Sequence, residues 1–189
     1  MLYLASKSPR RRELLTQLGV DFELIDASVD EYRRADESPS AYVSRVAREK
    51  AEAGLAALVD QPDALVLGAD TEVVLGGDVF GKPADGAEAA AMLRRLSGTA
   101  HEVISTVWLL SSRRRDSAQC VTRVRFGQLS APQIDRYIAT GEWHDKAGGY
   151  AVQGRGGALI AHLSGSYSGV MGLPLFETRS LLAGFGVEV

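Results

Sequence analysis

The stretch that most constrains the fold is "LYLASKSPRRRELLTQLG", Leu2 to Gly19, near the start of the chain. Its first residues are apolar or small and are typical of a strand, whereas the later ones have the apolar spacing of a helix. Three consecutive arginines, Arg10 to Arg12, fall in the first turn of that helix, where the helix dipole favours acidic side chains. This order indicates an α/β fold that binds an anion where the strand passes into the helix.

The loop before these arginines has the right chemistry for phosphate. Serine hydroxyls and free backbone N–H groups donate hydrogen bonds to phosphate oxygens, and arginine adds two parallel donors. A solvated basic turn is the commoner origin of three arginines in a row, but Ser6 and Ser8 beside a helix start favour a phosphate site. We expect Arg10 and Arg11 to contact a phosphate-rich ligand and Arg12, at another angle of the helix, to lie on the surface.

Length and composition indicate a single domain, residues 1–189. A chain of this length with 46% hydrophobic and 24% charged residues can bury one sizeable core. The net charge of -3 lacks the basic excess that is typical when nucleic acid or an anionic membrane is the main partner, so any anion site is local. No run resembles a signal peptide or a membrane span, so we expect a cytoplasmic protein.

The rest of the pattern alternates strands with helices and contains hairpins. Helical spacing of apolar residues follows Ser40, Asp85, Ser130 and Pro174. Strand patterns fall at residues 63–70, 101–112, 120–129 and 158–163. Gly76–Gly77 is typical of a two-residue hairpin turn. Because both helices and hairpins join the strands, we expect an α/β fold with a mixed, twisted sheet and flanking helices.

Lys50 is unusual within its helix. It follows Val43 by seven residues and Val46 by four, so it points with the apolar face, and no acid stands three or four residues away in the helix. Either it meets an anion from elsewhere, or its stem lies along the helix edge and its ammonium group reaches water.

Asp70 directly follows an apolar strand, so we expect it at the carboxyl end of that strand, where open α/β sheets place their ligands. A carboxylate there can bind a divalent cation or act as a general base toward water. The alternative is a turn residue that caps a backbone N–H group.

Several other charged residues, each taken alone, would be expected on the protein surface. Lys82 in "GKP" has the setting of a solvent-facing lysine in a turn, and Asp145 and Lys146 can pair with each other at a loop surface. Asp30 and Glu31 are loop acids that would reach a metal or water only if their loop folds over the site.

The chain lacks the residue patterns that several classes of function require. The three histidines are far apart and have no zinc-ligand spacing. Neither G-x-S-x-G nor G-x-x-x-x-G-K-[ST] occurs, which argues against a serine hydrolase and a P-loop nucleotidase. Cys120 is the single cysteine, so the chain cannot form an internal disulfide.

Taken together, these segments resemble the Maf family of nucleoside triphosphate pyrophosphatases. The matching segments are "LASKSPRRRELL", "VLGADTEVVLGGDVFGKP", "LSGTAHEV", "DKAGGYAVQG" and "GSYSGVMGLPL". They occur in the family's order and spacing over nearly the whole chain. The resemblance implies an elongated, two-lobed fold like that of inosine triphosphate pyrophosphatases, with the site in a cleft between the lobes.

The resemblance also implies the reaction. A member of this family is a cytosolic enzyme that hydrolyses modified or surplus nucleoside triphosphates between the α and β phosphates, with Mg²⁺ or Mn²⁺ as cofactor. A homodimer is implied, with no stable nucleic-acid or membrane partner. Water attacks the α-phosphorus, and Asp70 accepts its proton, orients it through the metal, or does both.

The family's functional positions fall on residues of this chain. The general base falls on Asp70, and Glu31 lies near the metal or the attacking water, so Asp70 and Glu31 are the expected metal ligands. The phosphate contacts fall on Ser8, Arg10, Arg11, Lys50 and Lys82. The residues expected to tune substrate choice are Arg10, Thr71 and Gln153.

The form "DKAG-x-Y-x-x-QG" resembles the branch of the family that acts on dTTP and UTP. The amide of Gln153 offers both a donor and an acceptor, which suits the edge of a pyrimidine. Two positions depart from the family pattern. Lys7 stands where a small or polar residue is usual, and Glu72 stands where the family tends to be apolar.

Two other functions use the same basic loop. One is a non-catalytic nucleotide- or RNA-binding regulator linked to cell-division arrest, although the chain lacks the aromatic stacking residues that binders of single-stranded nucleic acid generally need. The other is a phosphatase that releases the terminal phosphate, which would yield orthophosphate in place of pyrophosphate.

Overall fold

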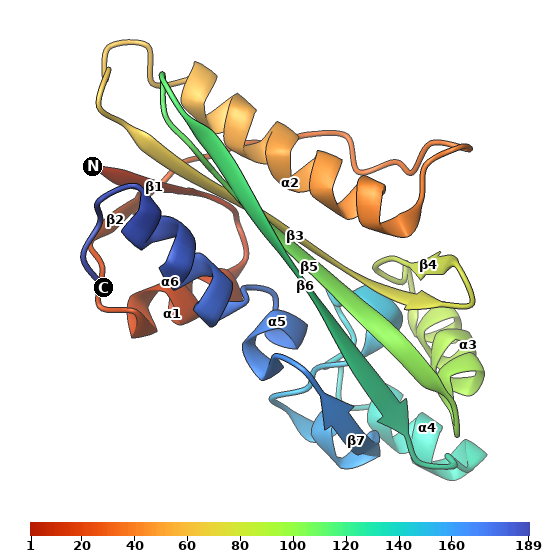
Figure 1. The fold of residues 1–189 in the computed structure, drawn as a ribbon. Coiled ribbons are helices and arrows are strands. Elements are labelled where there is room, and N and C mark those ends of the chain that lie inside the picture. Colours follow the sequence, from red (N-terminus) through yellow and green to blue (C-terminus); the bar gives the residue numbers. More distant parts are fainter.

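The computed structural model describes residues 1–189, and three long antiparallel strands form the centre of its seven-stranded sheet (Figure 1). These strands are β3 (Leu65–Leu75), β5 (Ala100–Leu110) and β6 (Arg115–Phe126). The shorter strands are β1 (Leu2–Ala5), β2 (Phe22–Leu24), β4 (Asp78–Phe80) and β7 (Ile160–Ser164). The order is β2-β1-β3-β5-β6-β7, with β4 also on β3. β1 runs parallel to β2 and β3, and all other pairs are antiparallel, so the expected mixed sheet is confirmed.

Helices cover both faces of this sheet. The longest, α2 (Pro39–Ala56), lies along one face (Figure 1). The other helices are α1 (Pro9–Gln17), α3 (Gly86–Leu96), α4 (Ala131–Ile138), α5 (Tyr167–Met171) and α6 (Leu175–Gly184). Two 3₁₀ turns, η1 (Ala147–Gly149) and η2 (Arg155–Leu159), lie in the glycine-rich segment before β7.

The alternation of side chains along β3 divides the core. Val66 and Val74 face α2, whereas Leu67, Ala69 and Val73 face the opposite side. On that opposite side, α1 and α6 pack against Leu67 and Ala69, and α3 and α4 pack against Val73 at the other end of the strand. Two apolar clusters therefore lie at opposite ends of one sheet face.

Local sequence signals set the ends of most elements. Asp85 caps α3, because its Oδ1 accepts a hydrogen bond from the backbone N–H of Glu88 at 2.8 Å. The turn between β3 and β4 has φ of +61° at Gly76 and +90° at Gly77, values that favour glycine. The helix after Asp85 and the hairpin turn at Gly76–Gly77, both predicted from the sequence, are confirmed.

The strand predicted at residues 63–70 extends further than expected. β3 does not stop at Asp70 but continues through it to Leu75, because β5 pairs with it along its whole length. Two short elements, β2 and α5, were also not predicted, since three and five residues carry too little periodicity to distinguish them from loops.

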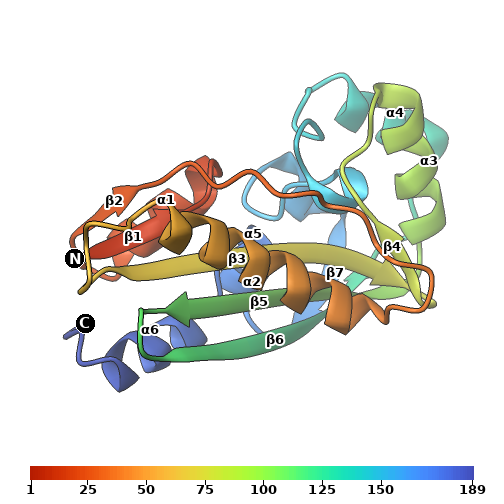
Figure 2. The same cartoon turned by 90° about the horizontal axis from the view of Figure 1, so that it is seen from above.

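The segment from β2 to α2, residues 25–38, crosses much of the length of the molecule. Figure 2 shows it leaving β2 near the N-terminus and reaching the start of α2 at the far end. On the way it passes the region between the α1 and α6 end of the sheet and the α3 and α4 end. Its residues 27–29 and 31 line a cavity there. None of the helices is both long enough and apolar enough to cross a lipid bilayer.

His101 is buried in the core on β5, and its ring has a single hydrogen-bond partner, Tyr150. Its Nε2 lies 2.8 Å from the hydroxyl of Tyr150, and its ring meets Phe126 edge to face. Nδ1 is buried without a partner. Burial therefore lowers the pKa of His101 to about 4.

We predict a specific acid sensitivity from this histidine. The unfolded chain takes up a proton near the ordinary pKa of 6.5, whereas the folded protein does not until about pH 4. The free energy of unfolding therefore falls as pH drops through this window, on the order of 3 kcal/mol from this group. His101→Gln should remove that slope in denaturant titrations across the window, and the exposed His162→Gln should retain it. Equal slopes in the wild type and His101→Gln would contradict the assignment.

Candidate active site

A cavity of about 450 Å³ lies where β1 ends and α1 begins. It contains every residue singled out above as a site residue. These residues are Ser8, Arg10, Arg11, Glu31, Lys50, Asp70, Thr71, Lys82 and Gln153. They come from segments far apart in the sequence, and the structure brings all nine to one place. Their individual roles stay predictions.

An interruption at the edge of the sheet opens this cavity onto β3. β1 pairs with β3 only as far as Gly68, and β4 begins to pair with it at Val73, so residues 69–72 have no neighbouring strand on this edge. Asp70 and Glu72 face the α2 side and Thr71 faces the other, and all three line the cavity. Asp70 thus lies in the middle of its own strand, and it is β1 whose carboxyl end opens at the site.

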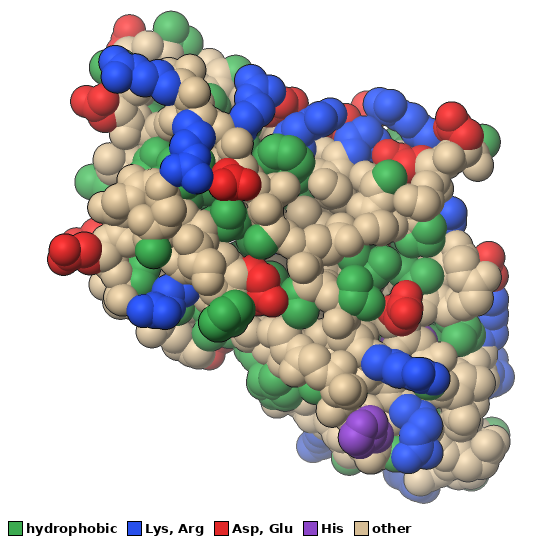
Figure 3. Space-filling model, viewed as in Figure 1, with side chains coloured by type: hydrophobic (Ala, Val, Ile, Leu, Met, Phe, Trp, Pro, Cys, Tyr) green, Lys and Arg blue, Asp and Glu red, His purple; other side chains and the backbone are tan.

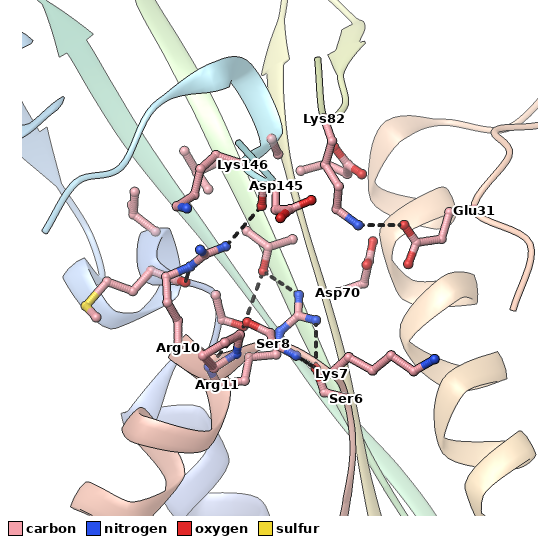
Figure 4. Close-up of a pocket in the computed structure, with 18 of the residues that line it drawn as sticks. Ser6, Lys7, Ser8, Arg10, Arg11, Glu31, Asp70, Lys82, Asp145 and Lys146 are labelled. Atoms are coloured by element: carbon pink, nitrogen blue, oxygen red, sulfur yellow. Dashed lines mark hydrogen bonds and ion pairs between the residues drawn. The ribbon is translucent and has the colours of Figure 1, made fainter. Parts of the chain in front are cut away.

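The basic loop is held in place by neutral groups. Arg10 donates from Nε to the carbonyl of Met171 and from Nη2 to that of Asp145, both at 3.3 Å (Figure 4). Arg11 donates from Nε to the carbonyl of Gly172 at 2.8 Å. Neither guanidinium forms an ion pair with a carboxylate, so both charges remain available to an anion. Burial, and then the charge of Arg11, lower the pKa of Arg10.

The surroundings of this loop agree with the sequence analysis. Ser8 caps α1, with its Oγ accepting from the backbone N–H of Arg11 at 3.4 Å. Arg12 is exposed, as expected. Lys7 points away from Arg10 and Arg11 (Figure 4), and its Nζ lies 2.9 Å from Asp26 Oδ1 in an exposed ion pair. Figure 3 shows basic and acidic side chains interspersed over the displayed face, so the anion site is a local feature.

Opposite the arginines, two lysines and two carboxylates form a continuous chain of ion pairs. Lys50 is buried, and its Nζ lies 2.8 Å from Asp70 Oδ1 and 2.6 Å from Glu31 Oε1. Lys82 Nζ lies 3.0 Å from Glu31 Oε2 (Figure 4). Lys50 therefore meets anions from elsewhere in the chain and does not reach out to water. The loop of Glu31 does fold over the site, and Lys82, although 55% exposed, pairs with it.

These pairs determine the charge of Glu31. Partial burial raises its pKa, but the attraction of Lys50 and Lys82 outweighs burial and lowers the pKa to about 2. Both of its oxygens are thus occupied by ammonium groups. Asp70 differs, because its Oδ2 is buried and has no hydrogen-bond partner.

Asp70 and its surroundings fit a divalent cation. No three His, Cys, Asp or Glu side chains are arranged as a complete metal site. Mg²⁺, however, is usually held by one or two carboxylates together with water and substrate phosphates. The free Oδ2 of Asp70 and the buried, partnerless Oε2 of Glu72 are oxygens of the kind that such an ion prefers.

The other end of the cavity is formed by the glycine-rich segment. Gln153 is exposed there, and no protein group bonds its amide. Glu142 holds the loop behind it, since its carboxylate accepts from the backbone N–H groups of Arg155 at 3.0 Å and Gly156 at 3.3 Å. Thr71 is less free, because its hydroxyl lies 2.7 Å from that of Ser105.

Sequence reasoning missed part of this lining. Asp145 and Lys146 do not pair with each other. The carbonyl of Asp145 accepts from Arg10, and Lys146 lines the cavity, where burial and then Arg10 lower its pKa. Glu72 was noted only as a departure from a pattern, and Ser6 only as a flanking serine. The position of Asp145 and Lys146 within "DKAGGYAVQG" was the available signal.

Comparison with known proteins identifies first the fold and then the family. The structure of the Staphylococcus aureus Ham1 protein matches 97% of this chain and 96% of its own, with a TM-score of 0.54 at 14% identity, so the two share a fold. The family model described as "Maf-like protein" matches residues 1–185. The chain belongs to the Maf-like family.

Several relatives that match nearly the whole chain carry the name dTTP/UTP pyrophosphatase. The relative from Xanthomonas euvesicatoria is 57% identical, with both chains fully covered. Those from Salmonella typhimurium and Hahella chejuensis are 55% and 50% identical, covering 97% and 100% of this chain and 92% and 94% of their own.

We predict that the two lysines at Glu31 contribute very differently to stability. Lys50→Met leaves the buried Asp70 without its cation and should lower the free energy of unfolding by about 3–5 kcal/mol. Lys82→Met breaks a partly exposed pair with the same glutamate and should change it by less than about 1 kcal/mol. Urea unfolding of both variants compares them directly. Equal losses would show that the buried pair does not support the fold.

Proposed function

We propose that this protein is a nucleoside triphosphate pyrophosphatase that hydrolyses dTTP and UTP to the monophosphate and pyrophosphate. The observation that carries the proposal is a cavity in which unpaired arginines face a buried carboxylate that has one free oxygen. The name shared by full-length relatives at 50–57% identity supports the choice of nucleotides.

The basic loop would receive the phosphates. Transfer of a phosphoryl group depends mainly on positioning and on neutralising charge, and both are available here. Arg10 and Arg11 offer guanidinium donors, and Ser8 lies at the N-terminus of α1, where backbone N–H groups and the helix dipole attract anions. Lys50 and Lys82 add positive charge on the opposite wall.

Asp70 would activate the water. Lys50 occupies its Oδ1 and so fixes the direction of the carboxylate. Oδ2 is left to act on the water, either by accepting its proton or by orienting it through a bound metal ion. The water would attack the α-phosphorus, and pyrophosphate would leave toward the arginines. Glu31 links Lys50 to Lys82 and keeps both lysines at the site.

A divalent cation, Mg²⁺ or Mn²⁺, would be held by Asp70 with Glu31 beside it. When bound, such an ion neutralises phosphate charge and supports the departure of pyrophosphate. The free oxygen of Asp70 suits this role, whereas Glu31 would have to exchange a lysine contact for it.

The pyrimidine would lie toward Gln153, whose free amide can donate to one carbonyl oxygen of the base and accept from the adjacent ring N–H. Thr71 would affect substrate choice through Arg11, whose Nη2 lies 3.5 Å from its hydroxyl. Since dTTP and UTP are cytoplasmic nucleotides, we expect the enzyme to act in the cytoplasm. The homodimer that the family resemblance implies stays a prediction.

The proposal predicts metal-dependent release of pyrophosphate, chiefly from dTTP and UTP. A panel of dTTP, UTP, CTP, GTP, ITP and 7-methyl-GTP, each with Mg²⁺, Mn²⁺ or EDTA, should be assayed for pyrophosphate and orthophosphate. Release of orthophosphate alone would indicate a terminal phosphatase. Binding without cleavage of any nucleotide would indicate a regulator.

Asp70→Asn tests the assigned base. The amide keeps the shape of the carboxylate but cannot take a proton, so kcat should fall by at least about 100-fold, the lower range for loss of general-base catalysis. Nucleotide binding, measured by calorimetry, should survive because the phosphate-binding loop is unchanged. The matched control is Asp135→Asn, an exposed aspartate on α4. Turnover near the wild-type rate in Asp70→Asn would overturn the assignment.

A further inference from the structure

Glu72 is a buried carboxyl group for which the fold offers no partner. Its side chain lies on β3 two residues after Asp70, on the same face of the strand, and the residue is 8% exposed. Oε2 has no hydrogen-bond partner, and no donor of the protein contacts either oxygen. Leaving a carboxyl group in such a place is unfavourable for folding.

The packing around Glu72 does not require an acid. The next residue on this face is Val74, which packs with Ile104 and with Val43 and Val46 of α2. Tyr42, the polar group of that cluster, donates its hydroxyl to the backbone carbonyl of Glu31 and not to Glu72. An apolar side chain would suit these neighbours and would avoid the cost of removing a carboxyl group from water.

The two lysines nearby are already paired with other carboxylates. Lys50 contacts Asp70 and Glu31, and Lys82 contacts Glu31. Three carboxyl groups therefore share two lysines, and Glu72 is the one without an ion pair. Two partnerless oxygens remain, Oδ2 of Asp70 and Oε2 of Glu72, on neighbouring positions of one strand face that lines the cavity.

We propose that Asp70 and Glu72 together hold a divalent cation, Mg²⁺ or Mn²⁺, through these two oxygens before any nucleotide binds. Two carboxylates, with water or phosphate oxygens in the remaining positions, are the usual ligands of such an ion in nucleotide-cleaving sites. The inference rests on the proposed function for the identity of the ion. The two partnerless oxygens support the site itself. Glu72 replaces Glu31 as the second carboxylate, which explains why Glu31 can remain between its two lysines.

The test is a titration of the full-length protein with Mn²⁺ alone, without nucleotide, followed by the electron paramagnetic resonance signal of the free ion. The wild type should bind one Mn²⁺ per chain. Glu72→Gln, which has the same shape, should weaken binding by at least about tenfold, a typical loss when the environment of a bound metal is altered. Glu72→Leu should give the same loss. The matched control is Glu102→Gln, an exposed glutamate on β5 opposite Val74, and it should bind like the wild type.

The outcomes separate this inference from the proposed function. Binding that disappears in both Glu72 variants supports the site even if no nucleotide is cleaved. Wild-type affinity in Glu72→Gln overturns the inference, as does a wild type that binds no Mn²⁺ without nucleotide, and either result leaves the pyrophosphatase proposal standing. Circular dichroism of each variant shows that it is folded, and removing a partnerless buried acid should not lower its melting temperature in EDTA.

Discussion

The buried ion pair between Lys50 and Asp70 is the interaction on which the rest of the site depends. It joins the helix that covers one face of the sheet to the strand at the centre of that sheet, at the point where the strand's edge is open. A buried ion pair adds little net stability, but the loss of either partner is strongly unfavourable. The pair therefore fixes Asp70, and through Glu31 it also brings the long 25–38 segment and Lys82 to the cavity.

The sheet makes this arrangement possible by leaving one edge unpaired. Between Gly68 and Val73, β3 has a neighbour on only one side, so side chains from both of its faces reach the same cavity. Asp70 and Glu72 approach it from one face, and Thr71 approaches it from the other, beside Arg11. The arrangement separates negative groups on the α2 side from the uncompensated arginines of α1. Such a division of charge can hold a metal ion and a polyphosphate next to each other.

Local signals in the sequence predicted the parts of the site that depend on local structure. The serine-containing loop, the basic helix start and the Gly76–Gly77 turn each follow from a few adjacent residues. Helical periodicity placed Lys50 on the apolar face of its helix but left open whether it meets an anion or reaches water. Its partners could not be predicted, because they come from other segments. The surroundings of Glu72 could not be predicted for the same reason. Its lack of a partner depends on how Lys50 and Lys82 are shared among three carboxyl groups, which only the folded structure determines.

The claim that water activated at Asp70 attacks the α-phosphorus is tested most directly by isotope transfer. UTP or dTTP is hydrolysed in water enriched in oxygen-18, and the products are examined by mass spectrometry. Attack at the α-phosphorus places one heavy oxygen in the nucleoside monophosphate and none in the pyrophosphate. Heavy oxygen in the pyrophosphate, or labelled orthophosphate in its place, would contradict the mechanism.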